Sequence, residues 1–251
     1  MRRAFAVIAL LLALAPVADA APPNGPPIVI VGGPKLGQQL FAANCVRCHG
    51  IDGRGVTRTT NAGSLGPPVR GVGALAPDFF LRTGYMPLAD AGDEPTRSRP
   101  SFTDAQIRAI VGYVASLGRG PAIPRPDPGS GSVKRGLELF TDHCAGCHQA
   151  VAEGGVLPGA KAPPLKRATD VQIAEAVRIG PYVMPKFTAR DISDADLNSI
   201  IAYVDYAKDP NDAGGWGIDH LGPFPEGMIT WLVAIPLLLL TCRLIGKKAG
   251  G

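Results

Sequence analysis

The chain has 251 residues, with 32 glycines, 25 prolines and only 6% aromatic residues. This composition favours small domains joined by loops over one large hydrophobic core. The formal net charge is +4 and the sequence has no run of five basic residues, so it gives no support for nucleic-acid binding.

The N-terminal segment is typical of a secretory signal. Met1-Arg2-Arg3 is followed by an apolar run that ends near Val17, and Ala18-Asp19-Ala20 resembles a cleavage site. The apolar run is shorter than the roughly 20 residues that span a bilayer. We therefore predict a signal peptide over residues 1–20 and a linker over 21–34, with an uncleaved N-terminal anchor as the alternative.

The C-terminal segment predicts a transmembrane helix over residues 228–246. It is long and apolar enough to span a bilayer, and Arg243, Lys247 and Lys248 lie at or just beyond its end. Basic residues at both ends of the chain place both on the cytoplasmic side of the cell membrane, so the residues between them are expected on the extracytoplasmic side. A buried soluble helix is the alternative. Cys242 has no assigned role beyond that of a small apolar membrane residue.

An internal duplication organises the middle of the chain. Gly37–Phe41 and Gly136–Phe140 each precede a C-x-x-C-H string at the same offset. Each string is followed by a proline pair, a Met-Pro and an amphipathic stretch: Pro67-Pro68 and Pro163-Pro164, Met86-Pro87 and Met184-Pro185, and residues 102–117 and 192–207.

The two amphipathic stretches predict helices, because their apolar residues recur at helical spacing. Thr103 and Ser193 are the expected N-caps. A further helix around Leu36, Leu40 and Phe41 leads into the first string. The expected buried faces comprise Ile107, Ile110, Val111, Val114 and Leu117 in the first repeat, and Leu197, Ile200, Ile201 and Val204 in the second. Gly37 and Gly136 would let a second helix approach closely.

The predicted fold is mainly α, with one small domain at residues 35–118 and a second at 133–208. A linker rich in proline, glycine and serine joins them at 119–132, and a second linker at 209–227 precedes the membrane segment. About eight additional polar residues between Met86 and Phe102 predict a surface loop in the first domain. Each domain has little aliphatic content, so a large apolar cofactor would complete its core.

The two C-x-x-C-H strings predict two covalently attached c-type haems. Cys45 and Cys48 in one string, and Cys144 and Cys147 in the other, would bind the porphyrin through thioethers, with His49 and His148 as iron ligands. A zinc site built from the four cysteines would leave the matched histidines unexplained. A thioredoxin-like redox pair expects a βαβ pattern, which the sequence does not show.

Two methionines are the expected sixth iron ligands. Met86 and Met184 occur once in each repeat, 37 and 36 residues after the histidine of their string. Methionines that only pack in the loops are the alternative. His143 and His220 are weaker candidates, because His143 adjoins Cys144 and His220 lies just before the membrane segment.

Histidine and methionine together fill both axial positions of the iron, which suits an electron carrier. The backbone carbonyls of Pro67 and Pro163 are the expected acceptors for the second ring nitrogen of each histidine. No nucleophile–base pair or phosphate-binding loop is recognisable, so we expect no catalytic residues in this chain.

With these residues, each repeat resembles a class I cytochrome c domain. The whole arrangement is similar to the dihaem cytochrome c subunit of the actinobacterial quinol–cytochrome c reductase, a bc-type complex. The resemblance covers nearly the full chain, and its specific strings are Gly84–Pro87, Gly180–Phe187, Gly214–Gly217 and Gly222–Met228. The fold implied is two tandem class I cytochrome c domains plus one C-terminal transmembrane helix.

The resemblance implies a non-catalytic electron-transfer subunit of this oxidoreductase. Its partners would be the Rieske iron–sulfur protein and cytochrome b of the same complex, and a terminal cytochrome c oxidase within one supercomplex. The longer basic N-terminus usual in the family is shortened here to Met-Arg-Arg, which leaves cleavage of the N-terminal segment open. The alternatives are an electron-acceptor subunit of a periplasmic dehydrogenase and a free membrane-tethered shuttle.

Overall fold

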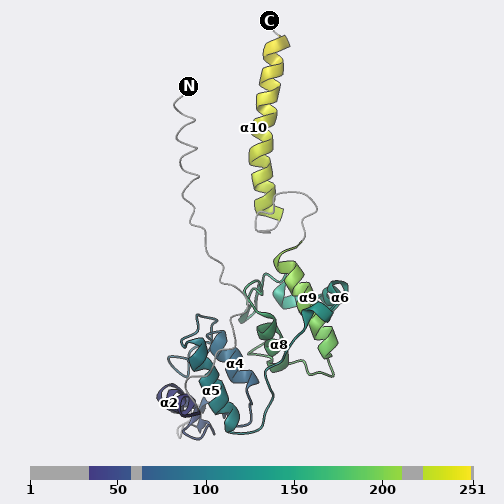
Figure 1. Cartoon of the computed structure of the whole chain (residues 1–251). Coiled ribbons are helices and arrows are strands. Elements are labelled where there is room, and N and C mark those ends of the chain that lie inside the picture. Colours follow the sequence, from purple (N-terminus) through teal and green to yellow (C-terminus); the bar gives the residue numbers. More distant parts are fainter. Residues whose placement is uncertain (1–33, 58–63, 211–222, 250–251) are drawn as a thin grey trace. The chain divides into compact units, whose positions relative to one another are not determined.

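A computed structural model describes residues 34–57, 64–210 and 223–249 (Figure 1). The predicted signal peptide, almost all of its following linker, His220 and the string at 214–217 lie outside these residues. The described chain is mainly helical and divides into two compact units. Unit 1 comprises the described residues up to Arg125 together with Val171–Thr188, and unit 2 comprises Pro126–Asp170 and the described residues from Ala189 onward.

Unit 1 contains five helices and one hairpin among its described residues. Its elements are α2 (Pro34–Asn44), α3 (Val46–His49), β1 (Val56–Thr57), β2 (Ser64–Gly66), α4 (Leu75–Arg82), α5 (Asp104–Ser116) and α8 (Asp170–Ile179), whose first residue belongs to unit 2. The two strands are antiparallel, with Val56 opposite Gly66.

Unit 2 repeats the order of leading helix, C-x-x-C-H turn, hairpin and closing helix. It contains the 3₁₀ turn η1 (Pro128–Ser130), α6 (Val133–His143), α7 (Ala145–His148), β3 (Gly155–Leu157), β4 (Ala160–Ala162), α9 (Asp194–Lys208) and α10 (Pro223–Ala249). β3 and β4 form an antiparallel hairpin with Val156 opposite Lys161. Neither hairpin was predicted from the sequence, because strands of two or three residues are too short to show an alternating pattern.

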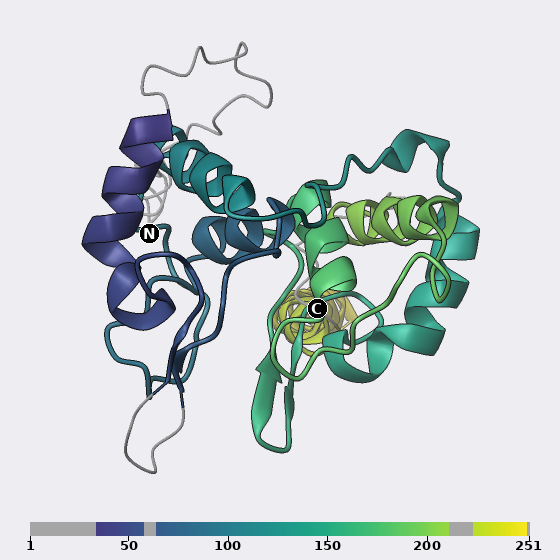
Figure 2. The same cartoon turned by 90° about the horizontal axis from the view of Figure 1, so that it is seen from below.

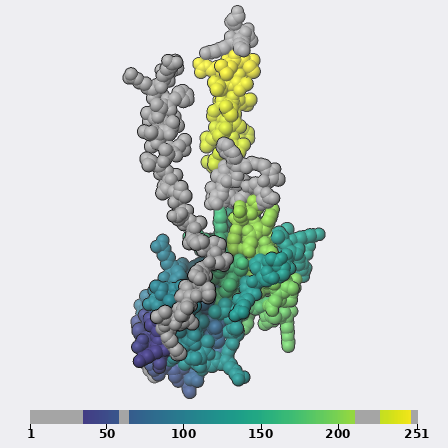
Figure 3. All heavy atoms as spheres, viewed as in Figure 1, coloured from purple at the N-terminus to yellow at the C-terminus, as the bar shows by residue number. Residues whose placement is uncertain are grey.

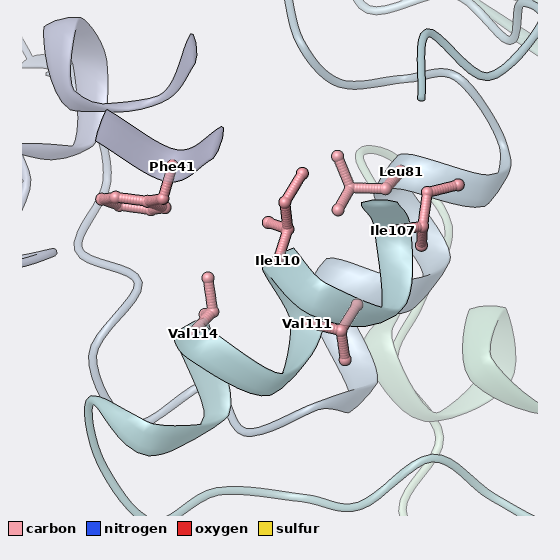
Figure 4. Packing of buried hydrophobic residues seen from close by; sticks show 6 residues of the cluster. All are labelled: Phe41, Leu81, Ile107, Ile110, Val111 and Val114. Carbon is pink, nitrogen blue, oxygen red and sulfur yellow. The ribbon is translucent and has the colours of Figure 1, made fainter. Parts of the chain in front are cut away.

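The core of unit 1 lies where α2, α4 and α5 meet (Figure 4). The predicted apolar face of α5 is confirmed there, apart from the half-buried Leu117 at the helix end. The buried side chains of this cluster, labelled in Figure 4, are at most 6% exposed: Phe41, Leu81, Ile107, Ile110, Val111 and Val114. Burying side chains of this size contributes about 1.5–3 kcal/mol each relative to leaving them in water.

The leading and closing helices pack in the same way in both units. Phe41 of α2 contacts Tyr113 of α5, and Phe140 of α6 contacts Tyr203 of α9, with ring centroids 5.3 Å apart and planes at 54° in both pairs. In Figure 2, α2 lies beside α5 and α6 lies beside α9. The duplication seen in the sequence is therefore also a duplication of packing geometry.

Both predicted N-caps are confirmed. The Thr103 hydroxyl accepts a hydrogen bond from the Gln106 backbone N–H, and the Gln106 side chain accepts one from the Thr103 N–H, which completes a capping box. The Ser193 hydroxyl accepts one from the Asp196 N–H at the start of α9. These caps satisfy backbone donors that would otherwise lack partners in the first helical turn.

The expectation that two glycines allow close helix approach is also confirmed. A Cβ atom on Gly37 would overlap the backbone carbonyl of Ala109 in α5, and one on Gly136 would overlap that of Ser199 in α9. Backbone cannot move aside as a flexible side chain can. The two helix pairs therefore owe their spacing to the missing side chains.

Helix α10 is long and apolar enough to cross a membrane over Gly227–Gly246. Its 27 residues correspond to a length of about 40 Å. None of its 18-residue apolar window is buried in the described residues, and Figure 3 draws this helix in yellow. Pro236 lies inside the helix without ending it.

We predict that Gly37→Ala lowers the free energy of unfolding of the haem-loaded chain by about 1–3 kcal/mol, because the new methyl group would force α2 away from α5. Gly112→Ala is the matched control, since a Cβ there meets nothing within 4 Å and alanine is the better helix former. Denaturant unfolding of both variants measures the difference. Equal stability of the two variants would contradict the tight crossing.

Candidate haem sites

The first C-x-x-C-H string forms a single helical turn. The Cys45 carbonyl accepts hydrogen bonds from the backbone N–H groups of Cys48, at 3.2 Å, and of His49, at 2.9 Å. This turn is α3, and it begins directly after α2 ends. The crossing of α2 with α5 therefore fixes where the two thiols and the imidazole start.

The second string repeats this turn in unit 2. The Cys144 carbonyl accepts from the N–H groups of Cys147, at 3.1 Å, and of His148, at 2.9 Å. After each turn the chain reverses through a tight loop, in which Gly55 N–H donates to the His49 carbonyl and Gly154 N–H donates to that of His148. Two sequences that share few residues beyond the motif thus form one local structure.

Each hairpin brings a proline carbonyl to its histidine, as predicted. β2 ends at Gly66 and β4 ends at Ala162, so the proline pair follows each hairpin directly. The Nδ1 atom of His49 lies 2.7 Å from the Pro67 carbonyl oxygen, and that of His148 lies 3.1 Å from the Pro163 oxygen. A neutral imidazole that donates from Nδ1 keeps Nε2 unprotonated, which is the form that binds a metal ion.

Burial favours the uncharged forms of these side chains. Desolvation lowers the pKa of His148, which favours the neutral imidazole. Burial, followed by the neighbouring cysteine of each string, raises the pKa of Cys45 and of Cys144 to about 11. A buried thiolate is therefore disfavoured, whereas a thioether carries no charge and suits an apolar site.

Met86 lies at the core of unit 1. It is partly buried and packs against the same cluster of apolar residues as Cys45 and Val46. Its backbone N–H donates to the Phe80 carbonyl at 3.1 Å, which anchors the loop to the end of α4. The structure thus brings Met86 and the first cysteine of the string to one apolar core.

Met184 lies in a loop anchored to α8. Its N–H donates to the Pro181 carbonyl at 3.0 Å, and Phe187 N–H donates to the Val177 carbonyl at 2.9 Å. This loop belongs to the segment assigned to unit 1, whereas His148 lies in unit 2. Iron ligation by Met184 therefore stays a prediction.

Of the two weaker ligand candidates, His143 and His220, the structure describes only the first. His143 is the last residue of α6, directly before Cys144, as its position in the sequence indicated. His220 lies outside the described residues. The expected polar loop between Met86 and Phe102 is confirmed, because residues 88–102 form neither helix nor strand and are mostly exposed.

An aromatic cluster next to both methionines was missed by the sequence analysis. Tyr85 precedes Met86, Tyr182 lies two residues before Met184, and their ring centroids are 5.2 Å apart. Phe80 contacts both tyrosines, at 6.4 and 6.0 Å. A tyrosine before the Met-Pro in both repeats was the available signal, but nothing in the sequence indicated that the two would meet.

The residues present fit a c-type haem in each unit. In both, a helical turn presents two thiols and a histidine whose Nδ1 is already engaged by a carbonyl. In unit 1 the neighbouring side chains form an apolar core of the kind that a porphyrin contacts.

Both halves of the chain match family models of cytochromes c. Residues 34–118 match the model described as cytochrome c. Residues 131–204 match the model described as cytochrome c oxidase, cbb3-type, subunit III. Two cytochrome c domains are therefore present, as predicted, and two such domains imply haem c.

Curated relatives match most of the chain. A cytochrome bc1 complex cytochrome c subunit of Corynebacterium diphtheriae is 35% identical over 85% of this chain and 80% of its own length. The protein of the same description from Mycobacterium bovis is 37% identical over 86% and 78%, respectively. A cbb3-type cytochrome c oxidase subunit CcoP of Azospirillum is 30% identical over 67% and 60%. The chain belongs to the family of cytochrome bc1 complex cytochrome c subunits.

Proposed function

We propose that this chain is the dihaem electron-transfer subunit of a respiratory quinol–cytochrome c reductase. It would accept electrons from the Rieske iron–sulfur protein of the complex and pass them through two His/Met haems to a terminal oxidase. The observation that carries this proposal is the match to bc1 complex cytochrome c subunits over 85% of the chain, which joins two cytochrome c domains in one protein.

The chain's own residues would hold each haem in place. Haem c supplies one-electron chemistry when it is bound. Cys45, Cys48, Cys144 and Cys147 would bind the two porphyrins covalently, His49 and Met86 would ligate one iron, and His148 and Met184 would ligate the other. The Pro67 and Pro163 carbonyls orient the two histidines.

With His49 and Met86 as ligands of one iron and His148 and Met184 as ligands of the other, neither haem would bind a substrate, so the chain would relay electrons rather than catalyse a reaction. Partners of the chain would include cytochrome b of the same complex. The terminal oxidase would join them in one supercomplex.

Helix α10 would anchor the chain in the cell membrane. Arg243, Lys247 and Lys248 lie near its C-terminal end, and positive charges favour the cytoplasmic side, so that end would lie in the cytoplasm. Both haem domains would then lie on the extracytoplasmic side. A labelling reagent that cannot cross the membrane should reach a cysteine introduced at exposed Glu94 but not one introduced at Gly251.

We predict that Met86→Ala and Met184→Ala each abolish one methionine–iron charge-transfer band and lower the potential of one haem, because each removes one thioether ligand. Optical spectra and redox titration of the haem-loaded chain measure both effects. Met228→Ala is the control, since Met228 lies at the exposed start of the membrane segment and should leave both haems unchanged. Unchanged spectra in both loop variants would refute His/Met ligation.

We also predict that an affinity tag on this chain co-isolates b-type haem and quinol oxidation activity from membranes. A chain shortened before Met228 should retain its c-type haems and lose its membrane anchor. The assignment to this complex would be wrong if the tagged full-length preparation showed c-type haem alone and no quinol oxidation. Co-isolation of a periplasmic dehydrogenase, without b-type haem, would instead support the alternative that this chain is the electron-acceptor subunit of such an enzyme.

A further inference from the structure

A buried carboxyl group without a donor lies on α8. The side chain of Glu175 is 0% exposed. Neither of its oxygens has a hydrogen-bond partner among the described residues. Burying an ionised carboxylate without a hydrogen-bond donor is costly, because the carboxylate loses its hydration and gains no hydrogen bond in return. The position therefore requires either a counter-charge or a proton.

The group that Glu175 faces is itself a carboxyl. Asp78 of α4 is likewise buried, at 3% exposed, and its side chain acts on Glu175 in the direction that favours the protonated form. Two carboxylates can only accept hydrogen bonds, so no bond between them exists without a proton. Burial raises the pKa of Glu175, and the charge of Asp78 raises it further.

Of the two carboxyl groups, the neighbouring arginine pairs with Asp78. The Arg82 Nε atom donates to both oxygens of Asp78, at 3.0 and 2.8 Å. Arg82 also pairs with Asp104 of α5, and Asp104 pairs with Arg108. Arg82 therefore stabilises Asp78 as the carboxylate, and its positive charge only partly offsets the rise in the pKa of Glu175.

We propose that Glu175 is a protonated carboxylic acid that donates a hydrogen bond to the Asp78 carboxylate, so that one buried proton fastens α8 to α4. The proton gives one of the two buried Glu175 oxygens a hydrogen bond and removes a second negative charge from the interior. Asp78 then accepts from Arg82 on one side and from Glu175 on the other.

This junction also holds together the two loops that carry the methionines. α4 leads to Met86 through the Phe80 carbonyl, and α8 leads to the loop of Met184. The contact between Tyr85 and Tyr182 joins the same two loops. Glu175 is thus a positioning residue for these loops. This role rests on the proposed ligation by methionine, but the proposal of a proton shared with Asp78 does not depend on that ligation.

The proton gives the junction a defined pH dependence. Because the pKa of Glu175 is raised above its ordinary value of 4.5, the folded chain binds one more proton than the unfolded chain above that pH. Stability is then lost as pH rises from the ordinary pKa toward the folded one. In that window, the equilibrium constant for opening of α8 should rise about tenfold per pH unit.

Glu175→Gln tests the proposal, because a glutamine amide donates to Asp78 at every pH and does not titrate. The infrared spectrum of the haem-loaded full-length chain at neutral pH should show a protonated carboxyl band that disappears in E175Q. Glu94→Gln is the matched control, since Glu94 is exposed on a loop of unit 1 and its replacement should leave that band intact.

Hydrogen exchange of the α8 amides gives a second readout. After correction for the intrinsic exchange rate, the α8 amides of E175Q should be at least as protected at neutral pH as those of the native chain. The ratio of the two protection factors should grow about tenfold for each unit by which pH rises. Asp78→Asn supplies a donor to Glu175 and should weaken the infrared band at neutral pH. A structural role for an ionised Glu175 predicts the reverse, namely loss of protection in E175Q.

An unchanged carboxyl band in E175Q, or protection in E175Q that keeps the native pH dependence, would overturn the proposal. Neither readout depends on iron ligation. The charge-transfer bands of Met86→Ala and Met184→Ala test that separately, so the two proposals can fail independently.

Discussion

The close crossing of the leading and closing helices is the constraint from which the haem-site geometry follows. At Gly37 and Gly136 a backbone carbonyl of the partner helix occupies the space that a Cβ would need. Each leading helix ends within one residue of the C-x-x-C-H turn, so its position sets where the thiols and the histidine begin. An aromatic pair of identical geometry fixes the rotation of each crossing. A displaced helix would therefore displace the histidine of its C-x-x-C-H turn.

The loop after each turn shows that backbone conformation is maintained more strictly than residue type. Gly50 and Gly53 have φ values of 76° and 70° in unit 1, where Gln149 and Ala152 have 60° in unit 2. A left-handed conformation costs a residue with a Cβ about 1–2 kcal/mol more than glycine. Unit 2 tolerates this cost at two positions because the loop must bring the Pro163 carbonyl to His148.

Much of this architecture could be predicted from the sequence, because its signals are local or repeated. The amphipathic stretches, the caps at Thr103 and Ser193, and the glycines of the helix crossings follow from spacing and residue type. The proline carbonyls could be predicted because a ligating histidine needs an acceptor and each repeat offers a proline pair at the same place. The short hairpins left no periodic signal.

The contacts between α4 and α8 could not be predicted, since they join segments about 100 residues apart with no matching pattern. Glu175 has the residue type of a solvent-facing position, so the sequence does not reveal that it is buried together with Ala174 and Val177. The same limit applies to Tyr85 and Tyr182, whose repeat-related positions suggest equivalence rather than contact.

The charged groups of unit 1 differ widely in what they contribute. The Arg47–Asp90 pair is exposed on both sides, so screening by water limits its contribution to less than about 1 kcal/mol. The group around Asp78 is different, because Asp78 and Glu175 are withdrawn from water and neither can exchange its partner for solvent. Removing Asp78 there would leave Arg82 without the carboxylate that it contacts through both oxygens, which costs more than the pair itself contributes. The proposed hydrogen bond from Glu175 to Asp78 would fix how α8 meets α4, so the carboxyl pair would specify this arrangement more than it stabilises the unit.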